Sequence, residues 1–170
     1  MRCALLITAL LALGGCNRCD AGTCNGCCSA DGECVAGTTV QQCGTKGAVC
    51  SACSASDFAQ CVIGECVLPA LISGPTTLDF GGVGVNTQAT GSVTLTNSGD
   101  LALVITDVTV DRNGFAVEPV PTAPIDPKQS VVVTFDFTPD TVGVFTSTAV
   151  ITSNAGSHSS YDIALTGTGN

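Results

Sequence analysis

The cysteines are the residues of this chain best suited to chemistry, and their distribution is uneven. Twelve cysteines are present in 170 residues, and all of them lie at or before Cys66. A thiol can form a disulfide, bind a metal ion, act as a nucleophile or accept a lipid. Other groups that titrate near neutral pH are scarce, since the chain has one histidine, His158. The reactions to consider for this chain are therefore mainly those of the cysteine thiols.

The remaining polar residues do not form a recognisable catalytic set. His158 stands in the polar turn 157–160, and the serines beside it lack the glycine-flanked nucleophile motif of hydrolases. Asp107 and Asp111 share strand parity and could approach each other, but an acid pair for glycoside hydrolysis needs a cleft, and none is predicted. We therefore expect no enzyme activity, no catalytic residue and no cofactor.

The charge of the chain limits its partners. Five Lys and Arg stand against 14 Asp and Glu, which gives a formal net charge of −9. This balance argues against binding to nucleic acid or to anionic lipid by charge. The expected partners are a membrane, reached through a lipid on the chain, and another protein or a surface glycan.

The first residues have the pattern of an export signal. An apolar run over 4–13 is too short to cross a hydrocarbon core of ~30 Å and fits a signal peptide. It ends in Leu13-Gly14-Gly15-Cys16, which resembles the bacterial lipobox. The resemblance implies a lipoprotein signal peptide at 1–15, a diacylglyceryl thioether on Cys16, a further acyl chain such as palmitate on its amino group, and a lipid-anchored start at 16–18. The expected location is the bacterial cell envelope, at the outer membrane.

Two other interpretations of this segment are a cleaved signal without lipid and an uncleaved anchor. Cysteine parity favours the lipoprotein. Removal of Cys3 with the signal leaves eleven cysteines, an awkward number for an exported chain. If Cys16 carries lipid, ten remain, and ten can pair.

These ten cysteines predict a disulfide-rich module over 19–66. The large apolar side chains of this segment are too few for a core at ~25 cal/mol per Å², so cross-links must replace it. They are Val35, Val40, Val49, Phe58, Val62 and Ile63. The cysteines, whose pairing cannot be read from the sequence, are Cys19, Cys24, Cys27, Cys28, Cys34, Cys43, Cys50, Cys53, Cys61 and Cys66.

Two alternatives for these cysteines are a zinc site and a redox site. Cys24-x₂-Cys27 and Cys50-x₂-Cys53 have the look of a zinc ribbon. Export and the six further cysteines nearby favour disulfides, so no metal is expected. A thioredoxin-like redox motif needs a βαβ context, which the segment lacks.

The module also has an internal repeat. Gly-Glu-Cys-Val occurs at 32–35 and at 64–67, and the two CxxC pairs precede it at similar places. We interpret the segment as two degenerate copies of one loop unit, joined through Cys43. The adjacent Cys27 and Cys28 are expected to bond to different partners, because a bridge between neighbours is strained.

The region 69–170 contains no cysteine and predicts a β-sandwich. Apolar residues alternate with polar ones between turn signals, as in Val131, Val133, Phe135 and Phe137. About seven short strands in some hundred residues are typical of an immunoglobulin-like sandwich.

Several segments of this region, in the same order, resemble the ASPM–SPD-2–Hydin (ASH) domain, also called the HYDIN-like or choice-of-anchor D domain. They are LDFGGVGV at 78–85, VTLTNSGD at 93–100, VVVTFDFTP at 131–139, GVF at 143–145, ITSN at 151–154 and LTGTG at 165–169. The resemblance implies an all-β, seven-stranded sandwich similar to major sperm protein, and it brings no catalytic residues.

The function expected from this organisation is that of a structural or binding module. Alternatives are an inhibitor or toxin-like knob, which needs an exposed reactive loop within 34–50, and an envelope assembly chaperone, which needs a long apolar edge strand. The expected edge at 114–120 is short and flanked by proline, which opposes strand addition. A binding or structural envelope protein is therefore the favoured prediction.

Overall fold

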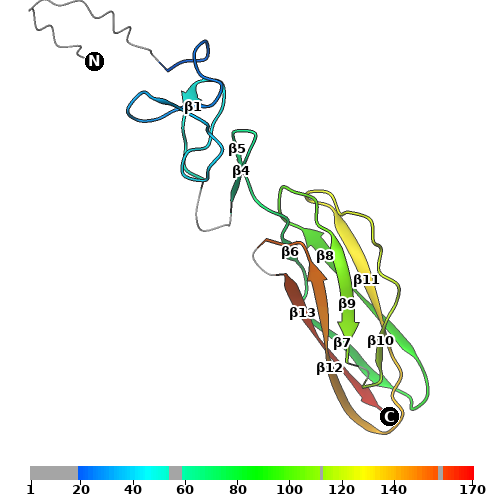
Figure 1. Ribbon diagram of the computed structural model, residues 1–170. Coiled ribbons are helices and arrows are strands. Elements are labelled where there is room, and N and C mark those ends of the chain that lie inside the picture. Colours follow the sequence, from blue (N-terminus) through cyan, green and yellow to red (C-terminus); the bar gives the residue numbers. More distant parts are fainter. Residues whose placement is uncertain (1–18, 54–58, 112, 157–158) are drawn as a thin grey trace, which may run out of the picture.

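The computed structural model describes residues 19–53, 59–111, 113–156 and 159–170. These residues form strands and turns, with no helix among them. It follows that the described part of the chain contains no helix able to cross a membrane. Cysteine-rich hairpins occupy one end of an elongated molecule and a sandwich the other (Figure 1). The predicted export signal, the lipid site Cys16, and Phe58 and His158 lie outside the described residues.

The cysteine-rich part contains two small sheets. Strand β1 (Cys27–Cys28) pairs antiparallel with β2 (Cys34–Val35) and parallel with β3 (Ala48–Val49). Strands β4 (Gln60–Val62) and β5 (Glu65–Val67) form a separate hairpin. Each strand has two or three residues, which is too short for a sheet to hold itself together.

Cysteines form the interior of this part. Among its described residues, the buried side chains of the hydrophobic class all belong to cysteines, namely Cys24, Cys27, Cys28, Cys43 and Cys53. Aliphatic side chains lie on its surface, with Val49 79% and Ile63 89% exposed. The prediction of a disulfide-rich segment is confirmed.

The sandwich consists of two four-stranded sheets. One has the order β10-β11-β8-β6 and the other β7-β13-β12-β9. Neighbouring strands run antiparallel, except that β7 and β13 are parallel. The strands are β6 (Ile72–Ser73), β7 (Thr77–Val83), β8 (Ala89–Asn97), β9 (Ile105–Val110), β10 (Phe115–Val117), β11 (Ser130–Phe137), β12 (Gly143–Ser153) and β13 (Ser160–Gly169).

Period-two alternation places the core between these sheets. Along β11, Val133, Phe135 and Phe137 are buried, whereas Val132 between them is 52% exposed. The ring of Phe137 lies 4.6 Å from that of Phe115 and 5.5 Å from that of Phe145, measured between ring centroids. The predicted all-β immunoglobulin-like sandwich is confirmed.

The two long sides of the sandwich differ. On one side the chain runs from β6 in the first sheet through 74–76 into β7 in the second, so the two strands are halves of one element that crosses between sheets. The predicted seven strands therefore become eight segments. On the other side each sheet ends in a separate strand, β9 and β10, and no ladder joins these two.

Candidate functional site

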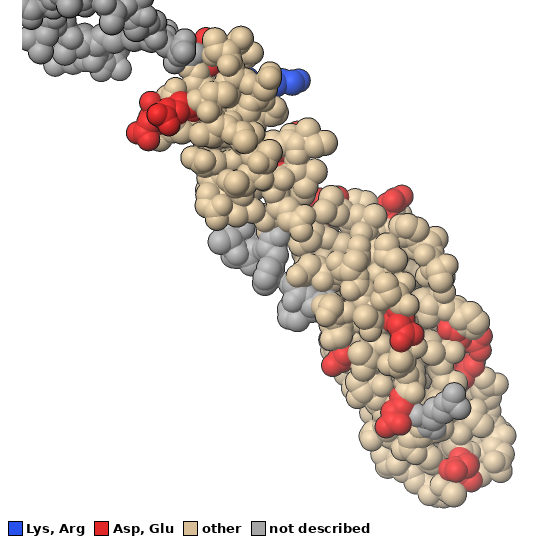
Figure 2. All heavy atoms as spheres, in the orientation of Figure 1, with Lys and Arg blue, Asp and Glu red and all other residues tan. Residues whose placement is uncertain are grey.

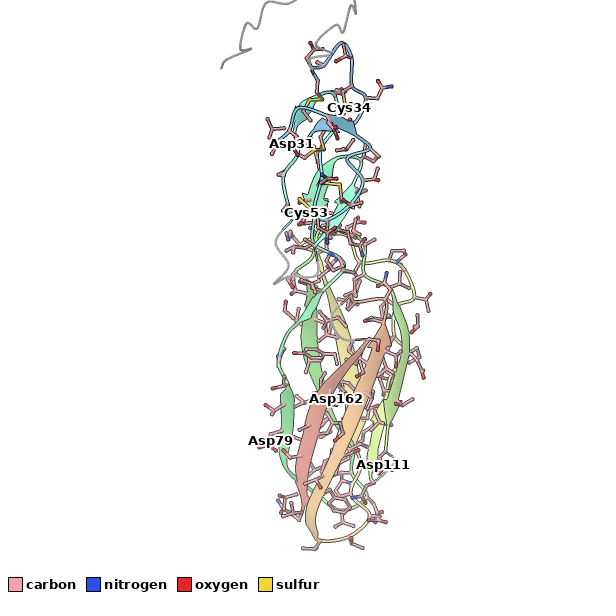
Figure 3. All side chains as sticks on the ribbon, turned by 60° about the vertical axis from the view of Figure 1, so that its left-hand side comes forward. Asp31, Cys34, Cys53, Asp79, Asp111 and Asp162 are labelled. Carbon is pink, nitrogen blue, oxygen red and sulfur yellow. A yellow bond between two sulfur atoms is a disulfide. The ribbon has the colours of Figure 1, made fainter. Side chains whose placement is uncertain are left out.

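All ten cysteines of the described chain are bonded in pairs. The five disulfides are Cys19–Cys28, Cys24–Cys34, Cys27–Cys50, Cys43–Cys61 and Cys53–Cys66. The neighbours Cys27 and Cys28 bond to different partners, as predicted. Figure 3 shows the sulfur–sulfur bonds gathered in the part that contains Cys34 and Cys53.

The pairing confirms a repeat and redefines its copies. Each copy has a hairpin in which two cysteines face each other across the strands, Cys28 with Cys34 and Cys61 with Cys66. Each facing cysteine bonds back to an earlier one, so that the first joins the third and the second joins the fourth in both copies. The disulfide Cys27–Cys50 then links the copies.

Two details of the predicted repeat were wrong. Cys43 does not join the copies, because it belongs to the second copy and bonds to Cys61. The two CxxC pairs are not equivalent either, since Cys24 corresponds to Cys53 rather than to Cys50. The spacing was misleading here, because similar gaps between cysteines in a loop-rich segment do not determine which cysteines are neighbours in space.

Sulfur atoms of neighbouring disulfides lie close enough to form two clusters. One contains Cys19, Cys24 and Cys28, and the other contains Cys43, Cys53 and Cys66, with all sulfur atoms of a cluster within 4.8 Å of one another. Every one of these atoms is already bonded to a second sulfur. A disulfide sulfur is not a thiolate, the form that binds metals and attacks substrates. In this pairing the clusters hold the fold together.

The junction between the two parts is hydrogen-bonded rather than loose. The Leu68 N–H donates to Asp100 Oδ2 at 3.0 Å, and the Leu68 carbonyl accepts from the Asp100 N–H at 3.1 Å. Lys128 donates to Asp100 Oδ1 at 3.0 Å. The Leu68 amide, followed by the Lys128 ammonium, lowers the pKa of Asp100. Two residues further on, the Gly156 N–H donates to the Ala70 carbonyl at 3.0 Å.

A buried amide organises this end of the sandwich. Asn97 is fully buried, and its Nδ2 donates to the carbonyls of Leu101 at 2.8 Å and Ile125 at 3.0 Å. Its Oδ1 accepts from the Gly99 N–H at 3.0 Å and from the Leu71 N–H at 3.4 Å. Asn97 thus ties the turn at its own end of β8 to Leu71, which directly precedes β6.

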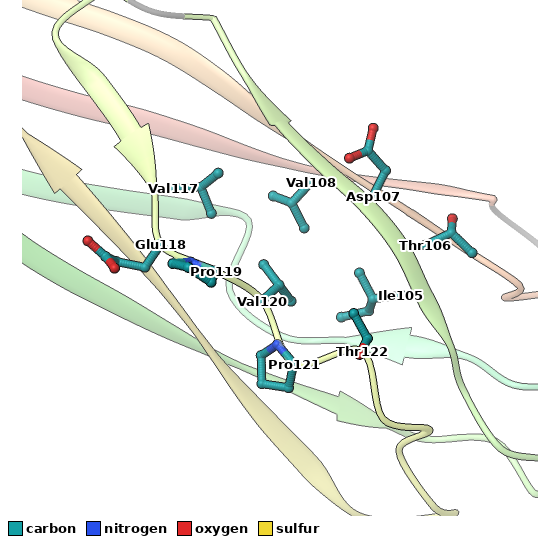
Figure 4. A pocket seen from close by; sticks show the side chains of 10 residues that line it. All are labelled: Ile105, Thr106, Asp107, Val108, Val117, Glu118, Pro119, Val120, Pro121 and Thr122. Atoms are coloured by element: carbon teal, nitrogen blue, oxygen red, sulfur yellow. The ribbon is translucent and has the colours of Figure 1, made fainter.

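The open side between β9 and β10 is a concave surface of the sandwich. One cavity of about 330 Å³ lies between 105–108 and 117–122, and a second of about 650 Å³ lies between 108–110 and 114–117. In the close view of Figure 4, Val108 and Val117 point toward each other between the two chain segments. Val108 is shared by both cavities, so they are adjoining parts of one groove, which we call the β9–β10 groove.

A pair of carboxyl groups lies on the β10 side of this groove. Asp136 is 8% exposed and accepts from Thr90 Oγ1 at 2.8 Å. Ala116 in β10 faces Asp136 in β11. Glu118, two residues after Ala116, is therefore the diagonal neighbour of Asp136 on the outer face of the sheet. A hydrogen bond with Asp136, followed by the repulsion of its negative charge, raises the pKa of Glu118.

The sequence pointed to a different acid pair. Asp107 lies in β9 and Asp111 just after its end, and four residues of extended chain separate them by about 13 Å. Shared strand parity was therefore not enough to bring them together. The pair Glu118 and Asp136 was missed because it depends on the register between β10 and β11.

Comparison with known proteins identifies the sandwich. The family model described as the HYDIN/CFA65/VesB-like, Ig-like domain matches residues 69–168, more than half of the chain. The chain belongs to this family. The predicted resemblance to ASH and HYDIN-like domains is therefore confirmed, and such an Ig-like domain is typically non-catalytic. None of the curated proteins matches the chain significantly.

Solved structures share the fold of this HYDIN-like domain at low sequence identity. A protein of unknown function from Porphyromonas gingivalis W83 is 17% identical, with a TM-score of 0.53, over 58% of this chain and 46% of that chain. The ASH/PapD-like domain 7 of human CEP192 is 13% identical, with a TM-score of 0.47, over 60% and 87%.

The secreted serine protease VesC from Vibrio cholerae is 17% identical, with a TM-score of 0.48, over 58% of this chain and 23% of that chain. The present chain thus spans less than half of the Porphyromonas protein and less than a quarter of VesC. At 17% identity the likeness to the Porphyromonas protein concerns the fold of the sandwich alone.

Proposed function

We propose that this HYDIN-like chain is a non-catalytic lipoprotein of the bacterial cell envelope. A lipid on Cys16 anchors it, at the outer membrane. The disulfide-rich part acts as a protease-resistant spacer, and the sandwich is held away from the membrane as a structural or binding module. Its partner is another protein or a surface glycan.

The observation that carries the proposed spacer role is the junction at Leu68. A sandwich on a flexible linker would need no contacts there, yet Leu68 and Asp100 exchange two hydrogen bonds directly after β5 ends. Lys128 reinforces the contact, donating to the carbonyls of Ser98 and Gly99 as well as to Asp100. A fixed junction suits a spacer that orients the domain it carries.

The alternatives draw less support from the structure. An inhibitor needs an extended reactive loop, but the exposed segment 38–42 is a tight turn closed by the bridge between Thr38 and Cys43. A chaperone that uses an edge strand needs a long apolar one. Strand β10 has three residues before Pro119, and three of the six residues of β9 are polar.

Membrane attachment tests the anchor. The variant Cys16→Ser should move from the membrane fraction to the soluble fraction in detergent phase partitioning, since its lipid attachment site is lost. Cys3→Ser is the matched control, because Cys3 lies within the predicted cleaved signal and should leave attachment unchanged. Membrane association of Cys16→Ser equal to that of the unaltered chain would refute the proposal.

The spacer role is tested by the shape of the whole chain in solution. Asp100→Ala removes the Leu68 amide's acceptor and the Lys128 ion pair, so small-angle X-ray scattering should report a broader distribution of interdomain distances. Asp79→Ala, on β7 far from the junction in Figure 3, should leave the distribution unchanged. An Asp100→Ala profile identical to that of the unaltered chain would contradict an oriented spacer.

A further inference from the structure

Strand β9 is an open edge at the rim of the β9–β10 groove. It is the last strand of its sheet, so the peptide groups on its outer edge have no strand partner within the described sheets. Its six residues contain no proline and no glycine. Exposed edges of this kind are where extended peptides add to a sheet.

The other edges of the sandwich are less suited to a partner strand. Strand β10 is followed at once by Glu118 and Pro119, and Pro121 comes two residues later. Strand β6 has two residues. Strand β7 changes register against β13 and has Gly81 at a positive φ of 66°. Strand β9 shifts register once against β12, opposite Thr152 and Ser153, and pairs regularly over 107–110. This four-residue stretch is therefore the part of the edges on which a ladder can be extended.

The groove beside this edge is apolar at its floor. Val108, Val117 and Val120 pack against the core but remain half-buried, which leaves part of each side chain at the surface. Ile105 and Val120 lie near each other across the gap in Figure 4. A strand laid along β9 would turn every second side chain toward this floor.

The rim of the groove is acidic. Exposed Asp107 lies on β9 and exposed Glu118 follows β10, and Glu118 is already close to Asp136. None of the described residues that line the two cavities is Lys or Arg. On the face drawn in Figure 2, acidic side chains are scattered over the sandwich and the basic side chain in view belongs to the cysteine-rich end. A cation would relieve the repulsion between the two carboxyl groups.

We propose that the β9–β10 groove binds an extended segment of another protein, apolar at alternating positions and bearing Lys or Arg between them. The segment adds to the outer edge of β9, turns its apolar side chains into the two cavities and places its cations beside Asp107 and Glu118. This rests on the binding role proposed above, but not on the lipid anchor. Its failure would therefore leave the Cys16 experiment unaffected.

The first test uses a synthetic probe of this chemistry. Fluorescence anisotropy measures binding of the labelled peptide Lys-Val-Thr-Val-Lys-Val-Thr-Val-Lys to the full chain in detergent. A second peptide with Glu in place of each Lys is the control for charge. The lysine peptide should bind, and more weakly as salt rises, whereas the glutamate peptide should not. Absence of binding, or equal binding of both peptides, would overturn the proposal.

Surface variants then locate the site. The double variant Asp107→Lys with Glu118→Lys reverses two exposed rim charges and should lower the affinity for the lysine peptide about tenfold or more. The double variant Asp79→Lys with Asp162→Lys is the charge-matched control, since both are exposed acids on strands of the same sheet as β9 and neither lines a cavity of the groove. Equal losses in the two proteins would mean that general charge attraction, and not this groove, binds the peptide.

Backbone-methylated peptides test strand pairing without altering the protein. An added strand pairs through one edge, so N-methylation of alternate residues should abolish binding for one of the two possible patterns and spare the other. If both patterns bind like the parent peptide, there is no ladder on β9. Self-association of the chain that the double variant abolishes would assign the groove to a second copy and would also refute the proposal.

Discussion

The cysteine-rich part and the sandwich are stabilised in different ways, the first by disulfides and the second by hydrophobic packing. In the first, the buried hydrophobic side chains among the described residues are those of cysteines, and Val49 and Ile63 are exposed. In the second, cysteine is absent, and buried phenylalanine, leucine, isoleucine and valine fill the space between two sheets. Sulfur cross-links suit strands of two or three residues, whereas packing needs strands long enough to alternate.

The difference shows how chain composition sets the means of stabilisation. A short segment cannot bury enough apolar area to offset the entropy of ordering it, so covalent bonds must restrict its unfolded state. Five of the six phenylalanines belong to the sandwich, which can therefore do without such bonds. The junction at Leu68 joins two parts that should respond to different perturbations.

Reduction of the disulfides should produce the largest difference in stability between the two parts. Dithiothreitol breaks five disulfides, each worth about 2–4 kcal/mol, so the cysteine-rich part should unfold while the sandwich stays folded. Limited proteolysis with mass spectrometry should find new cleavage sites before residue 68 and none between 72 and 169. New sites within β11 or β13 would show that the sandwich depends on the disulfides.

A core truncation should affect the sandwich alone. Phe137→Ala removes a fully buried ring that contacts Phe80, Phe115 and Phe145, and it should lower the free energy of unfolding by about 3–5 kcal/mol. Val49→Ala in the cysteine-rich part, where the side chain is exposed, should change it by less than about 0.5 kcal/mol. Chemical denaturation measures both. Similar losses of unfolding free energy in Phe137→Ala and Val49→Ala would mean that the two parts are stabilised by the same kind of hydrophobic core.

A polar variant at the junction end should have an intermediate effect. Asn97→Ala takes the side-chain donor from the Leu101 carbonyl, leaves the Ile125 carbonyl with the Leu103 N–H alone, and removes the acceptor of the Gly99 N–H. This should lower the free energy of unfolding by about 2–4 kcal/mol in the same assay. The exposed Asn113→Ala, which loses one bond of 3.5 Å to Thr146, is the control and should be nearly neutral. A neutral Asn97→Ala would contradict the role assigned to the buried amide.

The smallest effect is expected at Glu118. Its pKa is raised by Asp136, so the ionised form is disfavoured in the folded chain, and the resulting loss of stability is present at neutral pH and disappears below the ordinary value of 4.5. Glu118→Gln should therefore raise the melting temperature slightly at neutral pH and leave it unchanged in acid. A melting temperature lowered at neutral pH would contradict the repulsion.

The sequence predicted the parts of the fold that depend on local pattern. Alternation identified the buried face of β11, and cysteine density identified a disulfide-rich part. The pairing of ten cysteines could not be predicted, because it depends on which hairpins meet in space. The same limit applies to the groove, since sequence revealed β10 as an edge but not that β9 ends the facing sheet.

Hydrogen exchange of the full chain, with and without dithiothreitol, tests the contrast between the two parts most directly. We expect reduction to abolish protection of the amides in 24–53, including the Cys50 N–H that donates to the Cys28 carbonyl. Protection of β8, β11, β12 and β13 should remain within error of the oxidised chain. Loss of protection in these four strands on reduction, or its persistence in 24–53, would contradict the account.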